Sequence, residues 1–255
     1  MKRILASMVL VVLLFPALAS GETVKWGDLV KRERLFYKKF TDVPFTGKVT
    51  GKFQGRIKNG KRDGPWVRYF INRHRPSGQV RSKATYKDGV PDGPWVRYWR
   101  TGNLRSKGSY KYGEKDGPWI EYNYNGQLTS KRSYKIGMRD GLWVKYHSNG
   151  KARMKTTYKN GIRDGLWVYY HDNGKLWSKG TYKNGKQNGP WVNYHENGQL
   201  ASKGTYKNGK RDGLWEFFEK NGSKRFKPFK MIKDKGFTEW DDEGSGTYKD
   251  GKKIK

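Results

Sequence analysis

Residues 189–213 read GPWVNYHENGQLASKGTYKNGKRDG and contain every part of a repeating unit. Residues 189–195 have the composition of a β-strand, and Glu196-Asn197-Gly198 has that of a turn. Residues 199–207 form the return strand, which Asn208-Gly209 closes. Asn-Gly tolerates the two positive φ angles of a type I′ turn, the commonest tight connection between antiparallel strands. The unit is therefore predicted to be one β-hairpin.

The unit recurs along the chain with a period of 24 residues. A tryptophan column takes one step of 29 residues and then five steps of 24: Trp66, Trp95, Trp119, Trp143, Trp167, Trp191 and Trp215. A tyrosine column keeps the same step: Tyr86, Tyr110, Tyr134, Tyr158, Tyr182 and Tyr206. Hairpins repeated in this way pair edge to edge with their neighbours. We therefore predict an all-β fold, a linear array of antiparallel β-hairpin repeats forming one elongated, twisted sheet.

The repeat pattern divides the chain into four parts. We expect a signal peptide over residues 1–19, an N-terminal cap over 20–43, the hairpin array over 44–218, and a C-terminal cap with a degenerate repeat over 219–255. Caps are expected because the terminal hairpins of an array lack a neighbour on one side.

The first residues are predicted to direct export. Lys2 and Arg3 precede an apolar run from Ile4 to Phe15, and Ala17-Leu18-Ala19 supplies the small residues of a cleavage site. The alternative is an uncleaved anchor helix, but the apolar run is shorter than the ~20 residues that span a bilayer. We therefore expect a periplasmic or secreted protein cleaved near Ala19.

The repeated unit resembles the MORN repeat, specifically the bacterial variant found in tandem in exported proteins. The shared pattern is Asp-Gly-Leu/Pro-Trp-Val-x-Tyr, then Asn-Gly, then Ser-Lys-Gly-x-Tyr-Lys-Asn-Gly-Lys, over about residues 44–218. The resemblance implies a hairpin array that mediates binding or scaffolding. Some relatives carry the name of an antitoxin in a toxin–antitoxin pair, and eukaryotic arrays have been linked to phospholipid membranes.

The chain is strongly basic, with 55 Lys and Arg against 23 Asp and Glu and a net charge of +32. Two lysine columns keep the repeat period and form what we call the lysine stripe: Lys83, Lys107, Lys131, Lys155, Lys179 and Lys203, and Lys87, Lys111, Lys135, Lys159, Lys183 and Lys207. Successive lysines of a column would lie about 10 Å apart, near one Debye length, so their fields overlap. The stripe is the predicted binding site for an anionic partner. The alternative is that it keeps the sheet soluble and blocks edge pairing.

Strand alternation predicts which side chains share a face. Ser202, Tyr206 and their neighbours at even spacing point to one side and the stripe lysines to the other. Val192 and Tyr194 are expected on the tyrosine side, which would put Trp191 beside the lysine stems. The alternative is that the tryptophans are core residues.

Nothing in the sequence indicates catalysis. The chain has no Cys. The recurring acids sit in Asp-Gly links, where we expect them to bond their own backbone: Asp63, Asp92, Asp116, Asp140, Asp164 and Asp212. His147, His171 and His195 form a row at the repeat step, which suits a surface ladder better than a metal site. We predict no enzymatic activity, no cofactor and no metal.

These features predict a binding or scaffold protein of the cell envelope or exterior. Its basic face suits lipid headgroups, polysaccharide or an acidic protein, and peripheral membrane association fits this function. The alternative is a specific protein partner, including an antitoxin-like role. Nucleic acid would bind such a surface in vitro, but export argues against it as the natural partner. The sequence does not indicate an oligomeric state.

The mature protein should begin at or near Ser20, because the basic, apolar and small-residue segments before it form a cleavable signal. N-terminal sequencing of protein from the periplasm or the medium would measure this. Intact protein starting at Met1 in the cytoplasm would contradict it.

Overall fold

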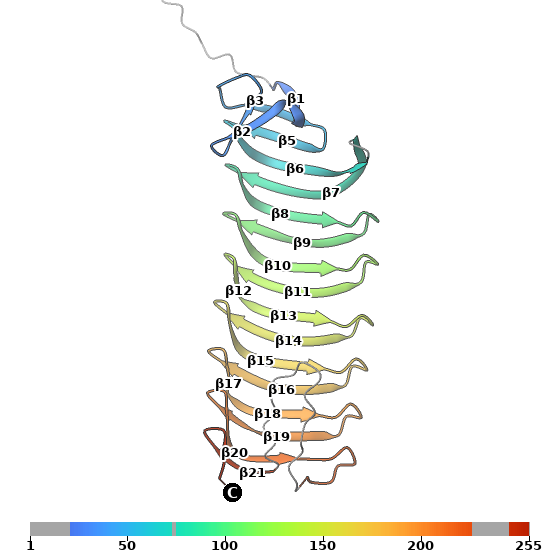
Figure 1. Cartoon of the computed structure of the whole chain (residues 1–255), viewed down its shortest axis with the longest axis vertical. Coiled ribbons are helices and arrows are strands. Elements are labelled where there is room, and N and C mark those ends of the chain that lie inside the picture. The colour runs from blue at the N-terminus through green and yellow to red at the C-terminus, as the bar shows by residue number, and fades with distance from the viewer. Residues whose placement is uncertain (1–20, 73–74, 226–244, 255) are drawn as a thin grey trace, which may run out of the picture.

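The computed structural model describes residues 21–72, 75–225 and 245–254. The predicted signal peptide and cleavage site lie outside these ranges. The described chain forms one long sheet of consecutive hairpins stacked in sequence order (Figure 1). The predicted all-β hairpin array is thereby confirmed. The described residues contain no helix with the length and apolar character of a membrane span.

Each repeat contributes an outgoing strand and a return strand. The outgoing strands are β6 (Lys61–Asn72), β8 (Val90–Tyr98), β10 (Glu114–Tyr122), β12 (Met138–Arg139) with β13 (Gly141–Tyr146), β15 (Ile162–Tyr170), β17 (Lys186–Gln187) with β18 (Gly189–Tyr194), and β20 (Lys210–Phe217). The return strands are β7 (Arg75–Lys87), β9 (Leu104–Lys111), β11 (Leu128–Lys135), β14 (Ala152–Lys159), β16 (Leu176–Lys183), β19 (Leu200–Lys207) and β21 (Gly246–Lys249), and β22 (Lys252–Lys253) follows. Neighbouring strands pair antiparallel throughout the array.

The N-terminal end of the array carries a small core. The segment before the repeats holds β1 (Thr23–Lys25), a 3₁₀ turn (Trp26–Asp28), and the hairpin of β2 (Leu29–Arg32) and β3 (Leu35–Lys38). Strand β1 pairs in parallel with β4 (Gly47–Thr50), which pairs with β5 (Phe53–Lys58). Trp26 packs on Phe53 and Trp66 with ring centroids 4.5 and 6.1 Å apart. These contacts cover the open edge of the first hairpin.

The two turns of each repeat differ in geometry. At the turn that links consecutive hairpins, both central residues are left-handed, as at Asn160 (φ 50°) and Gly161 (φ 84°). This is the type I′ geometry predicted for Asn-Gly. At the other turn only the glycine is left-handed, as at Gly150 (φ 82°), and the His147 N–H donates to the Lys151 carbonyl at 2.9 Å.

Strand register places the tryptophans on the same face as the tyrosines. Trp191 lies opposite Gly204, whereas Val192 lies opposite Lys203. The predicted position of Trp191 beside the lysine stems is therefore wrong, and so is the predicted position of Val192. The alternative, tryptophans as core, is confirmed, since Trp191 is 2% and Trp215 0% exposed. An indole buries far more apolar surface than a valine, so burial of the indole determines the phase of the strand.

The core of this single-layered sheet is a row of tryptophan and tyrosine rings that pack alternately against one another. Trp143 lies between Tyr134 and Tyr158, with centroid distances of 5.4 and 5.1 Å. Each such indole also covers the preceding strand, and the Trp215 Nε1–H donates to the Thr205 carbonyl at 3.0 Å. A Cβ on Gly204 would lie 2.2 Å from the Trp215 ring. Glycine is required here because the indole occupies the space of a side chain.

Gly204→Ala should destabilise the array by about 1–3 kcal/mol, because the added methyl displaces a fully buried indole. Urea unfolding followed by tryptophan fluorescence would measure the loss. Gly27→Ala is the matched control, since a Cβ there meets no atom within 4 Å. Equal stability of the Gly204→Ala variant and the wild type would contradict the packing role of this glycine.

Candidate functional site

The lysine stripe lies on the face opposite the tryptophans. Lys155 is paired with Val144 on one side and Val168 on the other. The same register places the first column of the stripe between valines or their counterparts along the array. The second column lies at the strand ends beside the type I′ turns, where Lys159 pairs with Ile162. The first lysine column therefore forms one row across the middle of the strands. The second column forms a row at the edge of the sheet, next to the type I′ turns.

Beneath the lysine side chains, this face of the sheet carries buried valines. Val144 and Val168 are each 6% exposed although the described residues place no second layer of strands or helices over them. The Lys155 ammonium lies 5.6 Å from the centre of the Tyr170 ring, which also belongs to this face. Long lysine stems cover apolar surface while their ammonium groups stay in water. These lysines therefore shield the valines as well as carrying charge.

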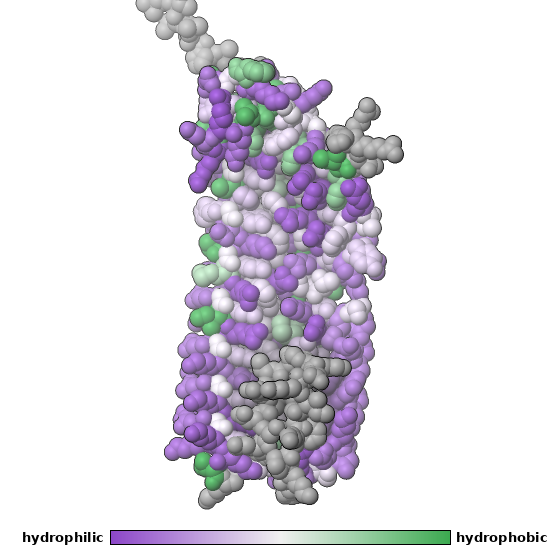
Figure 2. All heavy atoms as spheres, in the orientation of Figure 1, coloured by the Kyte–Doolittle hydropathy of each residue, from purple (hydrophilic) through white to green (hydrophobic). Residues whose placement is uncertain are grey.

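Carboxylates neutralise little of this stripe. Lys203 pairs with Glu216 at 2.9 Å, and Lys224 pairs with the other oxygen of Glu216 at 2.7 Å. Lys224 and Lys203 together lower the pKa of the Glu216 carboxyl. Within residues 21–72, 75–225 and 245–254, the other stripe lysines form no ion pair. Figure 2 shows hydrophilic side chains over most of the visible face, with hydrophobic ones in small separate patches.

The tryptophan face carries a position whose residue type varies between repeats. The residue two places after each tryptophan points to this face beside a serine or its counterpart, and its identity changes along the array: Arg68, Arg97, Glu121, Lys145, Tyr169, Asn193 and Phe217. Buried polar members are hydrogen-bonded, as Asn193 donates to Ser202 Oγ at 2.7 Å. Each repeat thus presents a different chemical group on a common frame.

β-Bulges add a second set of side chains to this face. Arg97 pairs with Ser106 and Tyr98 with Leu104, which leaves Arg105 as an extra residue on the return strand. A bulge re-aims the extra side chain. Arg105 consequently lines cavities with Trp95 and Trp119 instead of pointing to the lysine face, as simple alternation predicts. Sequence reasoning missed these arginines because no residue type marks the bulge.

The recurring aspartates join one hairpin to the next. Asp140 accepts a hydrogen bond at 3.2 Å from the Asn160 N–H, in the type I′ turn that follows. Asp92, Asp116 and Asp164 make the same contact at 3.1–3.2 Å with the residue twenty positions ahead. The prediction that they bond their own backbone is wrong for these four. The first left-handed residue of the turn has an N–H that faces the preceding Asp-Gly link, and the aspartate of that link accepts its hydrogen bond.

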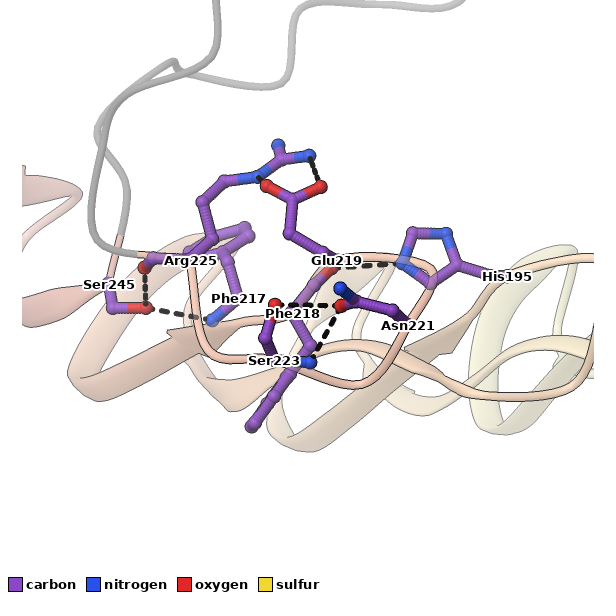
Figure 3. Close-up of polar contacts among 8 residues, drawn as sticks. All are labelled: His195, Phe217, Phe218, Glu219, Asn221, Ser223, Arg225 and Ser245. Carbon is purple, nitrogen blue, oxygen red and sulfur yellow. Dashed lines mark hydrogen bonds and ion pairs between the residues drawn. The ribbon is translucent and has the colours of Figure 1, made fainter.

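The histidines also join neighbouring repeats. His147, His171 and His195 donate from Nε2 to the carbonyls of Tyr170, Tyr194 and Phe218 at 3.0, 3.2 and 2.9 Å. Figure 3 shows the last of these contacts next to the Glu219–Arg225 ion pair. A carbonyl can only accept, so Nε2 carries the proton. Among the described residues, no group of three or more histidines and acids could hold a metal ion.

Comparison with known families agrees with this repeating geometry. The model of the MORN repeat variant matches five tandem segments of the chain. They are residues 91–112, 115–135, 139–160, 163–184 and 187–208. Each matched segment runs from the link before a tryptophan to the type I′ turn that closes the return strand, or to the residue before that turn. The link is Asp-Gly in four segments and Asn188-Gly189 in the last. No curated protein matches the chain. Five tandem segments of the chain are thus similar to the MORN repeat variant, and this similarity suggests a repeat-type binding or scaffold protein.

Asp140→Ala should cost about 1 kcal/mol of unfolding free energy, because the Asn160 N–H loses its acceptor. Asp140→Asn keeps an oxygen acceptor and should recover most of the loss. Chemical denaturation of the three proteins would measure the difference. Equal stability of the alanine variant and the wild type would show that water replaces the aspartate without cost.

Proposed function

We propose that this protein is a non-enzymatic binding or scaffold module of the cell envelope or exterior, and that its lysine face contacts an anionic envelope component. One observation carries the proposal: the first lysine column lies in file on one face, and Lys203 alone among its members pairs with a carboxylate in the described chain. Candidate partners are lipid headgroups, an acidic polysaccharide or an acidic protein surface.

The geometry favours many weak contacts over one strong site. The ammonium groups stand in water on flexible stems, and strand spacing sets them about 10 Å apart. Salt screens each contact, and the summed potential of the row attracts a polyanion. Affinity should therefore fall steeply with ionic strength.

A second candidate is a specific protein partner, which includes an antitoxin-like role. The variable positions of the tryptophan face favour it, because Glu121, Tyr169 and Asn193 give successive repeats different chemistry on one surface. A partner that reads several repeats would obtain its specificity from that series.

Changing Lys107, Lys131, Lys155 and Lys179 together to Gln should weaken binding to anionic vesicles at least about tenfold, since each lysine near such a surface contributes up to about 1 kcal/mol. Vesicle co-sedimentation at low and high salt would measure the loss. The matched control changes four exposed lysines outside the stripe to Gln: Lys31, Lys39, Lys145 and Lys220.

Equal loss in both variants would show that bulk charge alone matters. No loss in either would assign the stripe to solubility and direct the search for a partner to the tryptophan face.

A further inference from the structure

The N-terminal part of the tryptophan face contains a cavity of about 220 Å³. The rings of Trp66, Tyr86 and Trp95 form part of its wall. Five arginines also line it: Arg62, Arg68, Arg81, Arg97 and Arg105. None of the five forms an ion pair with a carboxylate in the part of the chain that the structure describes. The cavity therefore concentrates positive charge without a counter-ion from the described residues.

Around its indole the Trp95 unit differs from several of the other units. In four other units a cation just before the Asp-Gly link stacks on the indole, as Arg139 does on Trp143 at 4.8 Å and Arg211 on Trp215 at 4.9 Å. Pro91 takes that place in the Trp95 unit. On the strand before it Trp95 faces Ala84, where Trp191 lies over Gly180 and Trp215 over Gly204. The ring is consequently less deeply buried than Trp66 or Trp119.

Two buried donors in this cavity lack an acceptor. Trp95 Nε1 and Arg62 Nε are buried and have no hydrogen-bond partner among the residues that the structure describes. Five equivalent indoles donate a hydrogen bond; Trp119, for example, donates to the Ser109 carbonyl at 3.1 Å and Trp143 to the Ser133 carbonyl at 2.9 Å. An unpaired buried N–H costs free energy that a bound acceptor recovers. Both donors belong to residues that line the cavity.

The arginines reinforce one another. Burial, followed by the charges of Arg81, Arg62 and Arg97, lowers the pKa of the Arg68 guanidinium. A guanidinium remains charged at neutral pH even so. Arg68 and Arg97 flank Ser82 in one row of the sheet, and the bulge before Ser82 brings Arg81 to the same place. Repulsion within this group disappears when an anion binds among them.

We propose that this pocket binds a small oxyanion of the phosphate class, such as a pyrophosphate group or a phosphate monoester. Guanidinium forks match phosphate oxygens with paired hydrogen bonds, and several guanidiniums require a group with more than one negative charge. The volume lies below the 300–1,000 Å³ typical of drug-sized ligands, so it suits a small anionic group. The pocket lies on the face opposite the lysine stripe and does not depend on the function proposed for that face.

The test follows the indole N–H of Trp95 by ¹⁵N NMR in the full mature chain during titration with inorganic pyrophosphate. The Trp95→Phe variant assigns the signal. A saturable shift of this signal is expected, because the orphaned N–H gains an acceptor. No shift would overturn the proposal.

Arg81→Gln with Arg97→Gln removes two exposed guanidiniums from the pocket and should weaken binding at least about tenfold. The control Lys83→Gln with Lys107→Gln removes the same charge from the opposite face, partly on the same strands, and should change affinity less than about twofold. The remaining indole signals report whether each variant keeps the fold. Equal loss in both variants would overturn the pocket in favour of bulk charge.

Two further titrations define the chemistry. Citrate carries comparable charge on carboxylates, and equal affinity for citrate would overturn the assignment to phosphate. Glycerol 3-phosphate and vesicles containing phosphatidic acid both present a phosphate monoester. A Trp95 shift with the first supports a soluble ligand, and a shift with the second alone supports a headgroup.

Discussion

The fold depends on the contact between each tryptophan ring and the backbone of the strand before it. A single-layered sheet has no second layer to bury its apolar side chains. The indole solves this by lying over a glycine, as Trp215 lies over Gly204, and by filling the gap between neighbouring tyrosines. The strand glycines are therefore packing residues. They are distinct from the turn glycines, whose left-handed φ angles close the hairpins.

Because the core is confined to one face, the two faces have different properties. The lysine face repeats the same chemistry at nearly every unit, with valine covered by lysine stems. A surface of this kind suits a partner that is itself repetitive and anionic. The tryptophan face differs from unit to unit at two positions. One is the residue two places after the tryptophan, and the other is the extra residue at the bulge of the return strand. A varied surface suits a ligand or partner of defined shape.

Periodicity was sufficient to predict the array, its hairpins and its Asn-Gly turns, because these follow from residue types at fixed spacing. Strand alternation gave wrong faces for Trp191 and Val192, because the face of a residue depends on the strand register. The hairpin pairs Trp191 with Gly204, and the bulge beside Tyr194 shifts the return strand by one residue. The arginine pocket could not be predicted from the sequence either. Arg81 and Arg105 reach the pocket only because β-bulges redirect their side chains, and Pro91 stands where other units have a cation. Recognising either feature requires the strand register of the folded protein.

The way repeats are joined explains how one unit can depart from the pattern without disrupting the rest. Contacts such as Asp116 with the Ile136 N–H and His147 with the Tyr170 carbonyl bind each hairpin to the next, and their partners are backbone groups. These two links do not involve the tryptophan side chain, so they remain in place where the contacts of the ring are fewer. Trp66 and Trp119 stay 4% exposed on either side of the looser Trp95 unit. In a nearest-neighbour array the cost of a loosened ring stays within its own unit and interfaces, so a site can form where a packing residue is lost.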